Sequence, residues 1–448
     1  MIASKFTLVV PYSDTESILV NTLSGALDVV ERQLPEYLGL PLCDTQCEQT
    51  RFLASRGYLL PDHRVEEAVV AQMYRPLRAA ERANSPLHAV FILSFGCNLR
   101  CCYCWQQHRV AGTAFPTMTT QQVDDALAAL AALRQRLPEQ STQPPIIQLF
   151  GGEPLLRENY ALVAYVLRRC EALGYPVTIT TNGRELPYFR PLLMQYPVRE
   201  LQVTVDGDAP THNARRVGSD WHTLLDSVED LLLRTDILVK LRVNLDETVL
   251  EHLAPLADEI IDRLWYGTRQ FFCYIAPLRD DCMEKTEVIS ARATLLERFL
   301  DMRRHMAKLW CFELAGWDGF APYETLTRRR RMPTPSSGLC EVNRGQFVFD
   351  PDGTIHLCSE ETHCEWDNIG RYSPAFSLNE ERFFQIYNKL PIESPRCRDC
   401  ALLPVCGGSC CVLSEHPAYQ EAFCRTTRRV FDLAIQSYLL DDSEEAGI

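Results

Sequence analysis

Short runs of apolar, often β-branched residues alternate with longer amphipathic stretches between Leu87 and about Leu278. Such runs, bounded by turn-forming residues, are typical of strands, whereas the stretches between them have the spacing of helices. Strands are predicted at residues 88–94, 146–150, 177–181, 200–205, 237–244 and 271–276. Regular alternation of strands and helices indicates parallel βα units, so this part is predicted to be an α/β domain.

The pattern changes on both sides of this domain. Before it, strands are predicted at 6–10, 17–20 and 58–60, and helices at 26–34 and 47–56, the second ended by Gly57. After it, a helical segment at 291–309 leads to a linker at 328–338 that is rich in Pro and Ser. We therefore divide the chain into residues 1–85, 86–290, 291–335 and 336–448, the last ending in a helix.

Composition narrows the class of protein. The chain has 448 residues, of which 46% are hydrophobic, and a formal net charge of -14. An acidic chain is a poor binder of nucleic acid or anionic membranes, which need a basic surface. No apolar run is long enough to span a bilayer, and the first residues lack the features of a signal peptide, so we expect a cytoplasmic location. In a reducing compartment the 19 cysteines are expected to be metal ligands rather than disulfides.

Three cysteines, Cys97, Cys101 and Cys104, follow the first predicted strand with C-x3-C-x2-C spacing. A four-iron cluster normally takes four thiolates, so three would leave one iron open. A zinc knuckle is the alternative, but no His lies inside the triplet to complete a tetrahedral site. With its aromatic residue before Cys104, the motif resembles the signature of radical SAM enzymes, whose open iron binds S-adenosylmethionine (SAM). This resemblance implies a 5'-deoxyadenosyl radical and a partial (β/α)6 TIM-type barrel with its site at the strand ends.

Polar motifs follow the later strands at the matching ends. Gly151-Gly152-Glu153 resembles the element that contacts the amino group of SAM. Asn182 ends the third predicted strand. Thr204, Asp206 and a downstream arginine resemble the groups that hold the ribose and carboxylate, with Thr in place of Ser and, at Asn213, Asn in place of Asp. Arg216 is preferred over Arg215 on spacing alone. Each residue singly is equally consistent with a turn or helix cap.

Seven more cysteines form a second group near the end of the chain. They are Cys340, Cys358, Cys397, Cys400, Cys406, Cys410 and Cys424. Their spacing resembles the SPASM domain, which implies two auxiliary four-iron clusters and three in all. By resemblance, Cys397, Cys400, Cys406 and Cys424 hold the outer cluster and Cys340, Cys358 and Cys410 the inner one. The fourth inner ligand is Cys311, Cys364, Cys411 or a substrate thiolate.

The radical SAM and SPASM resemblances cover residues 88–424, about three-quarters of the chain. They imply a maturase that installs a carbon-carbon, carbon-oxygen or thioether crosslink in a ribosomally made peptide. The N-terminal region is similar to a winged-helix-like RiPP recognition element, which binds a leader peptide at a sheet edge, although a plain structural extension is equally consistent. The expected partners are a precursor peptide with its leader and an electron donor of flavodoxin or ferredoxin type.

Two other functions remain open from the sequence. One is formylglycine formation on a Cys or Ser, as in sulfatase maturases, where an Asp after the second SPASM cysteine is the base. Here Ser359, Glu360 and Glu361 follow Cys358, so Glu360 is the candidate catalytic base. The other is a non-catalytic iron-sulfur scaffold or regulator, which would not cleave SAM.

Overall fold

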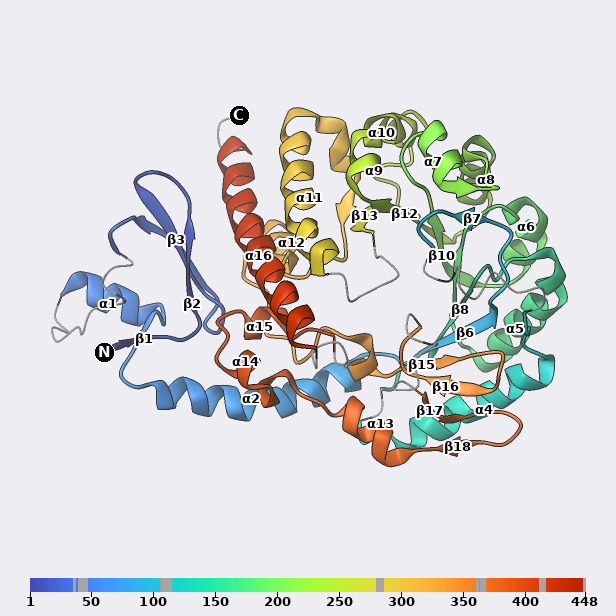
Figure 1. The fold of residues 1–448 in the computed structure, drawn as a ribbon, viewed down its shortest axis with the longest axis horizontal. Coiled ribbons are helices and arrows are strands. Elements are labelled where there is room, and N and C mark those ends of the chain that lie inside the picture. The colour runs from blue at the N-terminus through green and yellow to red at the C-terminus, as the bar shows by residue number, and fades with distance from the viewer. Residues whose placement is uncertain are drawn as a thin grey trace.

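A long mixed sheet with helices on its convex face dominates the molecule (Figure 1). The computed structural model describes residues 1–34, 38, 47–104, 106, 115–139, 141–278, 286–359, 362, 368–410 and 416–445. The sheet has eleven strands in the order β14-β13-β12-β10-β9-β8-β6-β15-β16-β17-β18. None of the helices in these ranges combines the length and apolarity needed to cross a bilayer.

Six parallel strands form the centre of this sheet, and all six were predicted to within two residues. They are β6 (His88–Ser94), β8 (Ile146–Gly151), β9 (Val177–Thr181), β10 (Val198–Thr204), β12 (Leu238–Leu245) and β13 (Phe271–Pro277). Each pairs in parallel with its neighbours. Parallel strands need crossover connections, which here are helical. The result is a mixed α/β fold whose sheet is consistent with a radical SAM partial barrel.

The crossover helices pack their apolar faces on the convex side of the sheet, where the main hydrophobic core lies (Figure 1). They are α4 (Thr120–Arg136), α5 (Tyr160–Leu173), α6 (Leu186–Gln195), α8 (Trp221–Arg234) and α10 (Leu253–Asp262). The short helices α7 (Ala209–Arg215) and α9 (Glu247–Glu251) follow the carboxyl ends of β10 and β12. Several begin at a side-chain cap, such as the capping box of Thr119 and Gln122 on α4. The carboxyl ends of the strands are left open on the concave side.

The C-terminal region continues the same sheet instead of forming a separate layer. Strand β15 (Gln346–Phe349) pairs in parallel with β6, and β16 (Thr354–His356), β17 (Asn368–Arg371) and β18 (Ser377–Leu378) follow as antiparallel neighbours. At the other edge lies the short β14 (Glu313–Leu314). A turn at Asp350–Gly353 joins β15 to β16. The sheet therefore crosses the boundary we drew at residue 336.

The N-terminal region contains a three-stranded antiparallel sheet of β2 (Thr7–Pro11), β3 (Glu16–Asn21) and β4 (Ala26–Glu31). The helix predicted at 26–34 is wrong, because residues 26–31 form β4. A turn at Gly25, with φ of 76°, returns the chain alongside β3, where Ala26 and Val30 enter the core. Pairing with β3 overrides the helical spacing. Helix α1 (Glu48–Ser55) is confirmed, as is β5 (Leu59–Leu60), which pairs with β1 (Ile2–Ala3).

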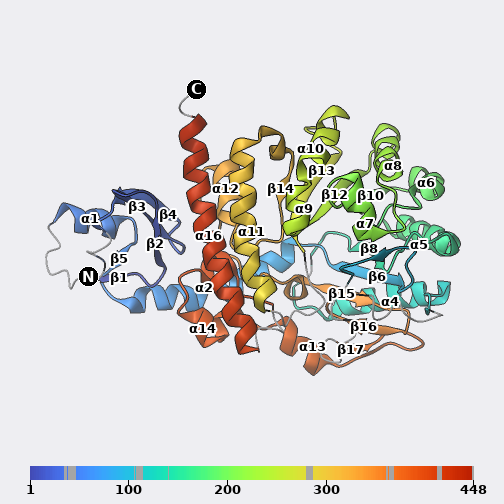
Figure 2. The same ribbon diagram turned by 45° about the horizontal axis from the view of Figure 1, so that its top comes forward.

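Two long helices join this region to the rest of the molecule (Figure 2). Helix α2 (His63–Asn84) runs under the C-terminal region, where Arg78 donates to Ser337 and Arg82 donates to the Asn343 carbonyl (2.9 Å). Helix α16 (Pro417–Glu445) lies between β2 and the pair α11 (Thr286–His305) and α12 (Ala321–Arg329). The small helices α13 (Glu380–Tyr387), α14 (Pro395–Arg398) and α15 (Leu403–Cys406) complete this end.

Candidate functional site

The first cysteine group occupies the loop at the carboxyl end of β6. Within it, β7 (Arg100–Cys101) pairs antiparallel with β11 (Arg216–Val217), so that Cys101 lies opposite Arg216. The Cys102 amide donates to the Arg215 carbonyl (2.9 Å). The loop is therefore fixed at its centre by the segment that follows the fourth barrel strand, and the predicted arginine lies beside a predicted ligand.

The triplet thiols lie close enough to influence one another and are largely shielded from water. Burial raises the pKa of Cys97 to about 11, and Cys101 adds to the shift. Burial also raises the pKa of Cys101, with a further contribution from Cys104. Cys97 Sγ accepts hydrogen bonds from the Leu99 amide (3.4 Å) and from Asn182 Nδ2 (3.8 Å). A thiol with a raised pKa keeps its proton until a metal displaces it. Binding of iron to this loop should therefore release protons.

Gly152 brings the loop after β8 into backbone contact with the cysteine loop. The Gly152 amide donates to the Ser94 carbonyl (3.0 Å), and the Glu153 amide donates to the Gly96 carbonyl (2.8 Å). A Cβ on Gly152 would lie 2.3 Å from the Gly96 oxygen, which no side chain tolerates. Glycine is needed here because two backbones touch.

The Glu153 side chain points into the protein. Its carboxylate accepts hydrogen bonds from Thr181 Oγ1 (2.6 Å) and from the Leu155 and Asn182 amides (2.9 and 2.7 Å). Burial raises its pKa above the usual range of a carboxyl. The carboxylate thus ties the second barrel strand to the third, and the atoms that Gly151–Glu153 can offer a ligand are those of the backbone.

Tyr103 links the cysteine loop to three other barrel segments. Its hydroxyl donates to Asp206 Oδ2 (2.5 Å) and accepts from Arg216 Nη1 (2.6 Å) and Asn244 Nδ2 (3.2 Å). Asp206 is completely buried, and Arg216 is 6% exposed. In this arrangement Asp206 and Arg216 hold Tyr103 and, through it, the loop between Cys101 and Cys104.

His212 fixes the backbone at Asp206, a role that the sequence analysis did not find. Burial lowers the pKa of His212 to about 3, so the ring is neutral. Its Nδ1 accepts the Asp206 amide (3.2 Å), which leaves Nε2–H to donate to Ser219 Oγ (2.9 Å). Arg215 in turn pairs with Asp246 (2.7 Å) and approaches Asp206 (3.7 Å). The sequence evidence for His212 was its place at the start of His212-Asn213-Ala214-Arg215-Arg216, the segment whose resemblance to the family pattern singled out Asn213 and Arg216.

Of the other predicted residues, Thr204 and Asn182 end neighbouring barrel strands. Thr204 ends β10, is 8% exposed and lies in register with Arg242 of β12. Asn182 follows β9, is 6% exposed and donates to Asn98 Oδ1 of the cysteine loop (2.8 Å). The structure therefore brings all the predicted residues of this first site around one loop.

Four cysteines of the second group, Cys397, Cys400, Cys406 and Cys424, gather where α14, α15 and α16 meet. Burial raises the pKa of Cys424 to about 11, with further contributions from Cys397 and Cys400. Burial likewise raises the pKa of Cys406, to which Cys400 and Cys424 also contribute. The four thiols assigned to the outer site are therefore neighbours in space. The segment before Cys340 adjoins them, since the Leu339 amide donates to the Gly407 carbonyl (3.2 Å).

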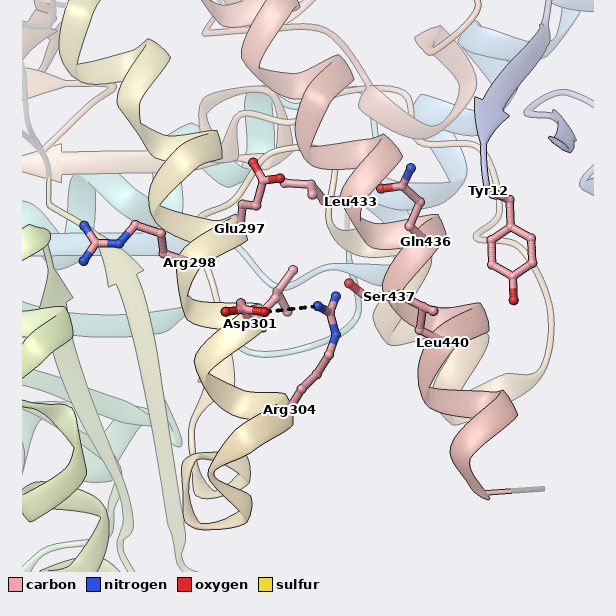
Figure 3. A pocket seen from close by; sticks show the side chains of 10 residues that line it. Tyr12, Glu297, Arg298, Asp301, Arg304, Leu433, Gln436, Ser437 and Leu440 are labelled. Carbon is pink, nitrogen blue, oxygen red and sulfur yellow. Dashed lines mark ion pairs between the residues drawn. The ribbon is translucent and has the colours of Figure 1, made fainter. Parts of the chain in front are cut away.

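A groove of about 490 Å³ lies between α11 and α16 and is separate from the cysteine loop (Figure 3). Its charged side chains are already paired: Arg304 with Asp301 (3.7 Å), Arg298 with Glu247, and Glu297 with Arg429 (2.8 Å). No cysteine lines it. The cysteine loop, rather than this groove, is the candidate site of chemistry.

Comparison with known families agrees with this choice. Residues 91–254 match the model of the Radical SAM superfamily. This part of the chain is similar to radical SAM domains. Over 139 residues the chain is 34% identical to the 7-carboxy-7-deazaguanine synthase of Halobacterium salinarum, covering 29% of this chain and 48% of that protein. The chain is also 25% identical over 220 residues to a GTP 3',8-cyclase of Peptoclostridium acidaminophilum, covering 48% of this chain and 56% of the relative. The chain spans about half the length of these curated relatives.

Solved structures extend the likeness beyond the radical SAM domain. Native anSMEcpe with bound AdoMet and Kp18Cys peptide superposes with a TM-score of 0.56 at 16% identity, covering 80% of this chain and all of that one. Streptococcus suis SuiB bound to S-adenosylmethionine gives a TM-score of 0.51 at 14% identity and covers 94% and 98%. At these identities the likeness establishes the fold, including extra regions on both sides of the barrel.

A radical SAM domain implies a four-iron cluster and SAM, and the cysteine loop fits that group. In the described part of the chain, no three Cys, His, Asp or Glu side chains converge as ligands of a single ion. A four-iron cluster needs a wider spacing, because each thiolate binds a different iron. The choice of a cluster over the zinc knuckle left open by the sequence therefore rests on the match to the radical SAM model.

Tyr74 gives an independent indication at the outer cysteines. Its side chain is 0% exposed, and its hydroxyl has no hydrogen-bond partner among the described residues. Burial raises its pKa, and Cys406, Cys397 and Cys400 add to that shift, so these thiols are its neighbours. A buried hydroxyl without a partner costs about 1–3 kcal/mol. An acceptor bound by the thiols would remove that cost.

The fourth ligand of the proposed inner cluster is not assigned. Cys311 is buried beside Cys273 near β13, where burial raises the pKa of both thiols. Its described neighbours thus include no auxiliary cysteine, which does not favour it as the fourth ligand. Cys364, Cys411 and the candidate base Glu360 lie outside the described residues.

Replacing Gly152 with alanine tests the fit of the two loops. Because the new Cβ would meet the Gly96 and Phe95 carbonyls at 2.3 and 2.4 Å, we expect a loss of about 1–3 kcal/mol in stability and poor retention of iron at the triplet. Gly174→Ala is the control, since that glycine has φ of 66° and no atom within 4 Å of a Cβ. This control variant should lose about 1 kcal/mol of stability and retain its iron. Iron analysis and thermal unfolding measure both, and equal iron retention in the two variants would contradict the prediction.

Proposed function

We propose that the chain is a radical SAM peptide maturase with two auxiliary clusters, which installs a crosslink in a ribosomally made precursor peptide. The observation that carries this proposal is the gathering of Cys397, Cys400, Cys406 and Cys424 beside Tyr74, because cleavage of SAM needs only the first cysteine triplet. A second redox centre is useful when the product radical must lose an electron as the new bond forms.

The residues of the first site divide into ligands and supports. Cys97, Cys101 and Cys104 would hold a four-iron cluster that binds SAM and, once reduced, supplies a 5'-deoxyadenosyl radical. The backbone of Gly151–Glu153 faces the same loop and is the proposed contact for the SAM amino group. Asn182, Thr204, Asp206 and Arg216 are proposed to bind or orient the remaining SAM groups. Asp206 and Arg216 do so by holding Tyr103.

We propose that the N-terminal sheet binds the leader peptide at β4. The other edge, β2, is already engaged, since Arg428 and Gln436 of α16 donate to the carbonyls of Val9 (3.2 Å) and Pro11 (2.7 Å). An added strand needs a sheet edge with open backbone groups. The neighbour SuiB has been solved with its precursor peptide SuiA, at a TM-score of 0.50. If the N-terminal region is only a structural extension, it should bind no leader peptide.

Helix α2 connects this sheet to the auxiliary site. Glu66, near its start, accepts from the Ser4 hydroxyl (2.8 Å) and the Lys5 amide (3.1 Å), while Tyr74, two turns later, faces the outer cysteines. An external flavodoxin or ferredoxin is the proposed electron donor for the first cluster. The contacts of α2 and the seven cysteines support the proposed SPASM assignment of residues 336–448.

Formylglycine formation is the second candidate, favoured by the superposition on anSMEcpe with its bound peptide. It requires a base near the inner cluster, for which Glu360 is the candidate. Glu360→Gln that still forms product would exclude this role for Glu360. A non-catalytic scaffold is the third reading, and it predicts no 5'-deoxyadenosine at all.

The maturase proposal is tested by searching the neighbouring open reading frames for short peptides and using each one found as a substrate. The anaerobically reconstituted chain is incubated with each peptide, SAM and a reductant, and the peptides are analysed by mass spectrometry. A crosslink removes two hydrogen atoms, whereas formylglycine made from Cys replaces the thiol by an aldehyde. Formation of 5'-deoxyadenosine with every peptide unchanged would count against the crosslinking assignment.

Tyr74→Phe tests the auxiliary site without touching a ligand. In the metal-free chain the substitution removes a hydroxyl without a partner, so stability should stay equal or rise. In the loaded chain it should change the midpoint potential and EPR spectrum of the outer cluster at unchanged iron content, because hydrogen bonds tune iron-sulfur clusters. The control is Tyr372→Phe, whose hydroxyl donates to the Asp350 carbonyl (2.6 Å). It should lower stability and leave that spectrum unchanged; the opposite pattern would contradict the assignment.

A further inference from the structure

The concave face of the barrel sheet carries polar side chains beside the cysteine loop. On β12, Val239, Leu241 and Val243 face the helices and belong to the main core. Residues alternate along a strand, so Arg242 and Asn244 face the concave side. Asn244 Nδ2 contacts Tyr103 of the cysteine loop (3.2 Å). Arg242 is two residues earlier on the same face, about 7 Å further from that contact.

The concave face has two chemically different walls. One is apolar and comes from β6, β8, β15 and the cysteine loop. Its residues are Val90, Ile92, Phe95, Phe115, Phe150 and Val348, which pack together as a separate cluster. The facing wall is polar, and Tyr274 Oη donates there to Gln202 Oε1 (2.7 Å). In this wall Thr204, Arg242 and Tyr274 lie in register on three neighbouring strands.

Arg242 is the charged group of the polar wall that no carboxylate neutralises. It is half-buried, and its Nε donates to Asn244 Oδ1 (2.9 Å). Across the described residues, no ion pair joins Arg242 to an Asp or Glu, although acidic residues outnumber basic ones by 59 to 45. By contrast, Lys240, one pair deeper on the same face, is bound to Glu200 (2.8 Å).

An arginine held at Nε still presents donors in a planar fork that matches a carboxylate. Arg242 also hydrogen-bonds the Tyr274 side chain on the neighbouring strand, which leaves further donors for a carboxylate that reaches the concave face. We propose that Arg242 binds a carboxylate of the substrate peptide, with an adjacent apolar side chain against the partly exposed rings of Phe115 and Phe150. The substrate is then a segment with an acidic residue, or a free C-terminus, next to an apolar residue. This inference rests on the proposed peptide maturase function.

Three dipeptide probes test the inference on the reconstituted full chain with SAM present: N-acetyl-Asp-Leu-amide, N-acetyl-Asn-Leu-amide and N-acetyl-Leu-Leu with a free carboxylate. Affinities are measured by ligand-observed NMR. The wild type should bind the Asp probe about tenfold or more tightly than its Asn twin, as a charge-assisted pair implies. Tight binding of the free-carboxylate probe instead identifies the C-terminus as the source. Arg242→Gln should remove the preference, and Arg242→Lys should keep part of it.

Two further measurements separate the possible failures. SAM affinity should change less than about threefold in Arg242→Gln; a loss comparable to that of the probe would assign Arg242 to SAM and overturn the inference. The surface variant Arg234→Gln, which loses an ion pair with Asp230 on α8, controls for net charge and should keep the preference. Equal binding of the Asp and Asn probes by a wild type that forms 5'-deoxyadenosine overturns the inference alone. A wild type that forms none overturns the proposed function.

Discussion

Cys101→Ala is expected to abolish the reductive cleavage of SAM, reducing 5'-deoxyadenosine formation by at least about a hundredfold. Cys101 lies at the centre of the first site, paired with Arg216 and coupled to Cys104. Without its thiolate, only two ligands remain, too few to hold a four-iron cluster. The chain should lose about four irons and the absorbance of one cluster, and chromatography of the nucleosides released from SAM gives the activity.

The matched control for this prediction is the next residue. Cys102 is exposed, and the contact that holds it is made by its backbone amide to Arg215, which alanine retains. Cys102→Ala should therefore keep both the iron and the cleavage of SAM. Full activity in Cys101→Ala, or equal loss in both variants, would show that the triplet is not the cluster site.

Cys400→Ser is expected to separate SAM cleavage from product formation. Cys400 contributes to the raised pKa values of Cys397, Cys406 and Cys424, so it lies within the outer group. Iron should fall from about twelve to about eight per chain. Formation of 5'-deoxyadenosine should persist, because the first site is intact, whereas the crosslinked product should fall at least about tenfold.

Cys47→Ser is the control for Cys400→Ser, since Cys47 precedes α1 and contacts Gln49 in the N-terminal region. It should keep the iron content and the product of the wild type. An unchanged iron content in Cys400→Ser would contradict a cluster at the outer cysteines. Iron replaced by zinc in the wild type would contradict the SPASM assignment as well.

The sequence predicted the parts of the molecule that depend on local pattern. The strand that begins at His88 and ends at Ser94 was predicted with its observed bounds, because its residues are apolar on both faces and a cysteine loop follows. Arg216 was selected over Arg215 by spacing, and it does lie opposite Cys101. Motifs at the ends of parallel strands converge whatever the loop details, so their joint position could be foreseen.

Other features arise from contacts between distant segments. Residues 26–31 have a helix-like spacing, yet they pair with β3 across the turn at Gly25. The pairing of β15 with β6 joins residues about 260 apart in sequence and has no local pattern. Tyr74 was not predicted as a neighbour of the outer cysteines either, because its position depends on how α2 crosses the C-terminal region.

The central claim is that the cysteine loop cleaves SAM reductively, and one assay tests it most directly. The reconstituted chain is incubated anaerobically with SAM and dithionite, and 5'-deoxyadenosine is quantified beside Cys101→Ala and Cys102→Ala. We predict 5'-deoxyadenosine from the wild type and from Cys102→Ala, and none above background from Cys101→Ala. A wild type that carries its full iron and yields no 5'-deoxyadenosine would contradict the claim.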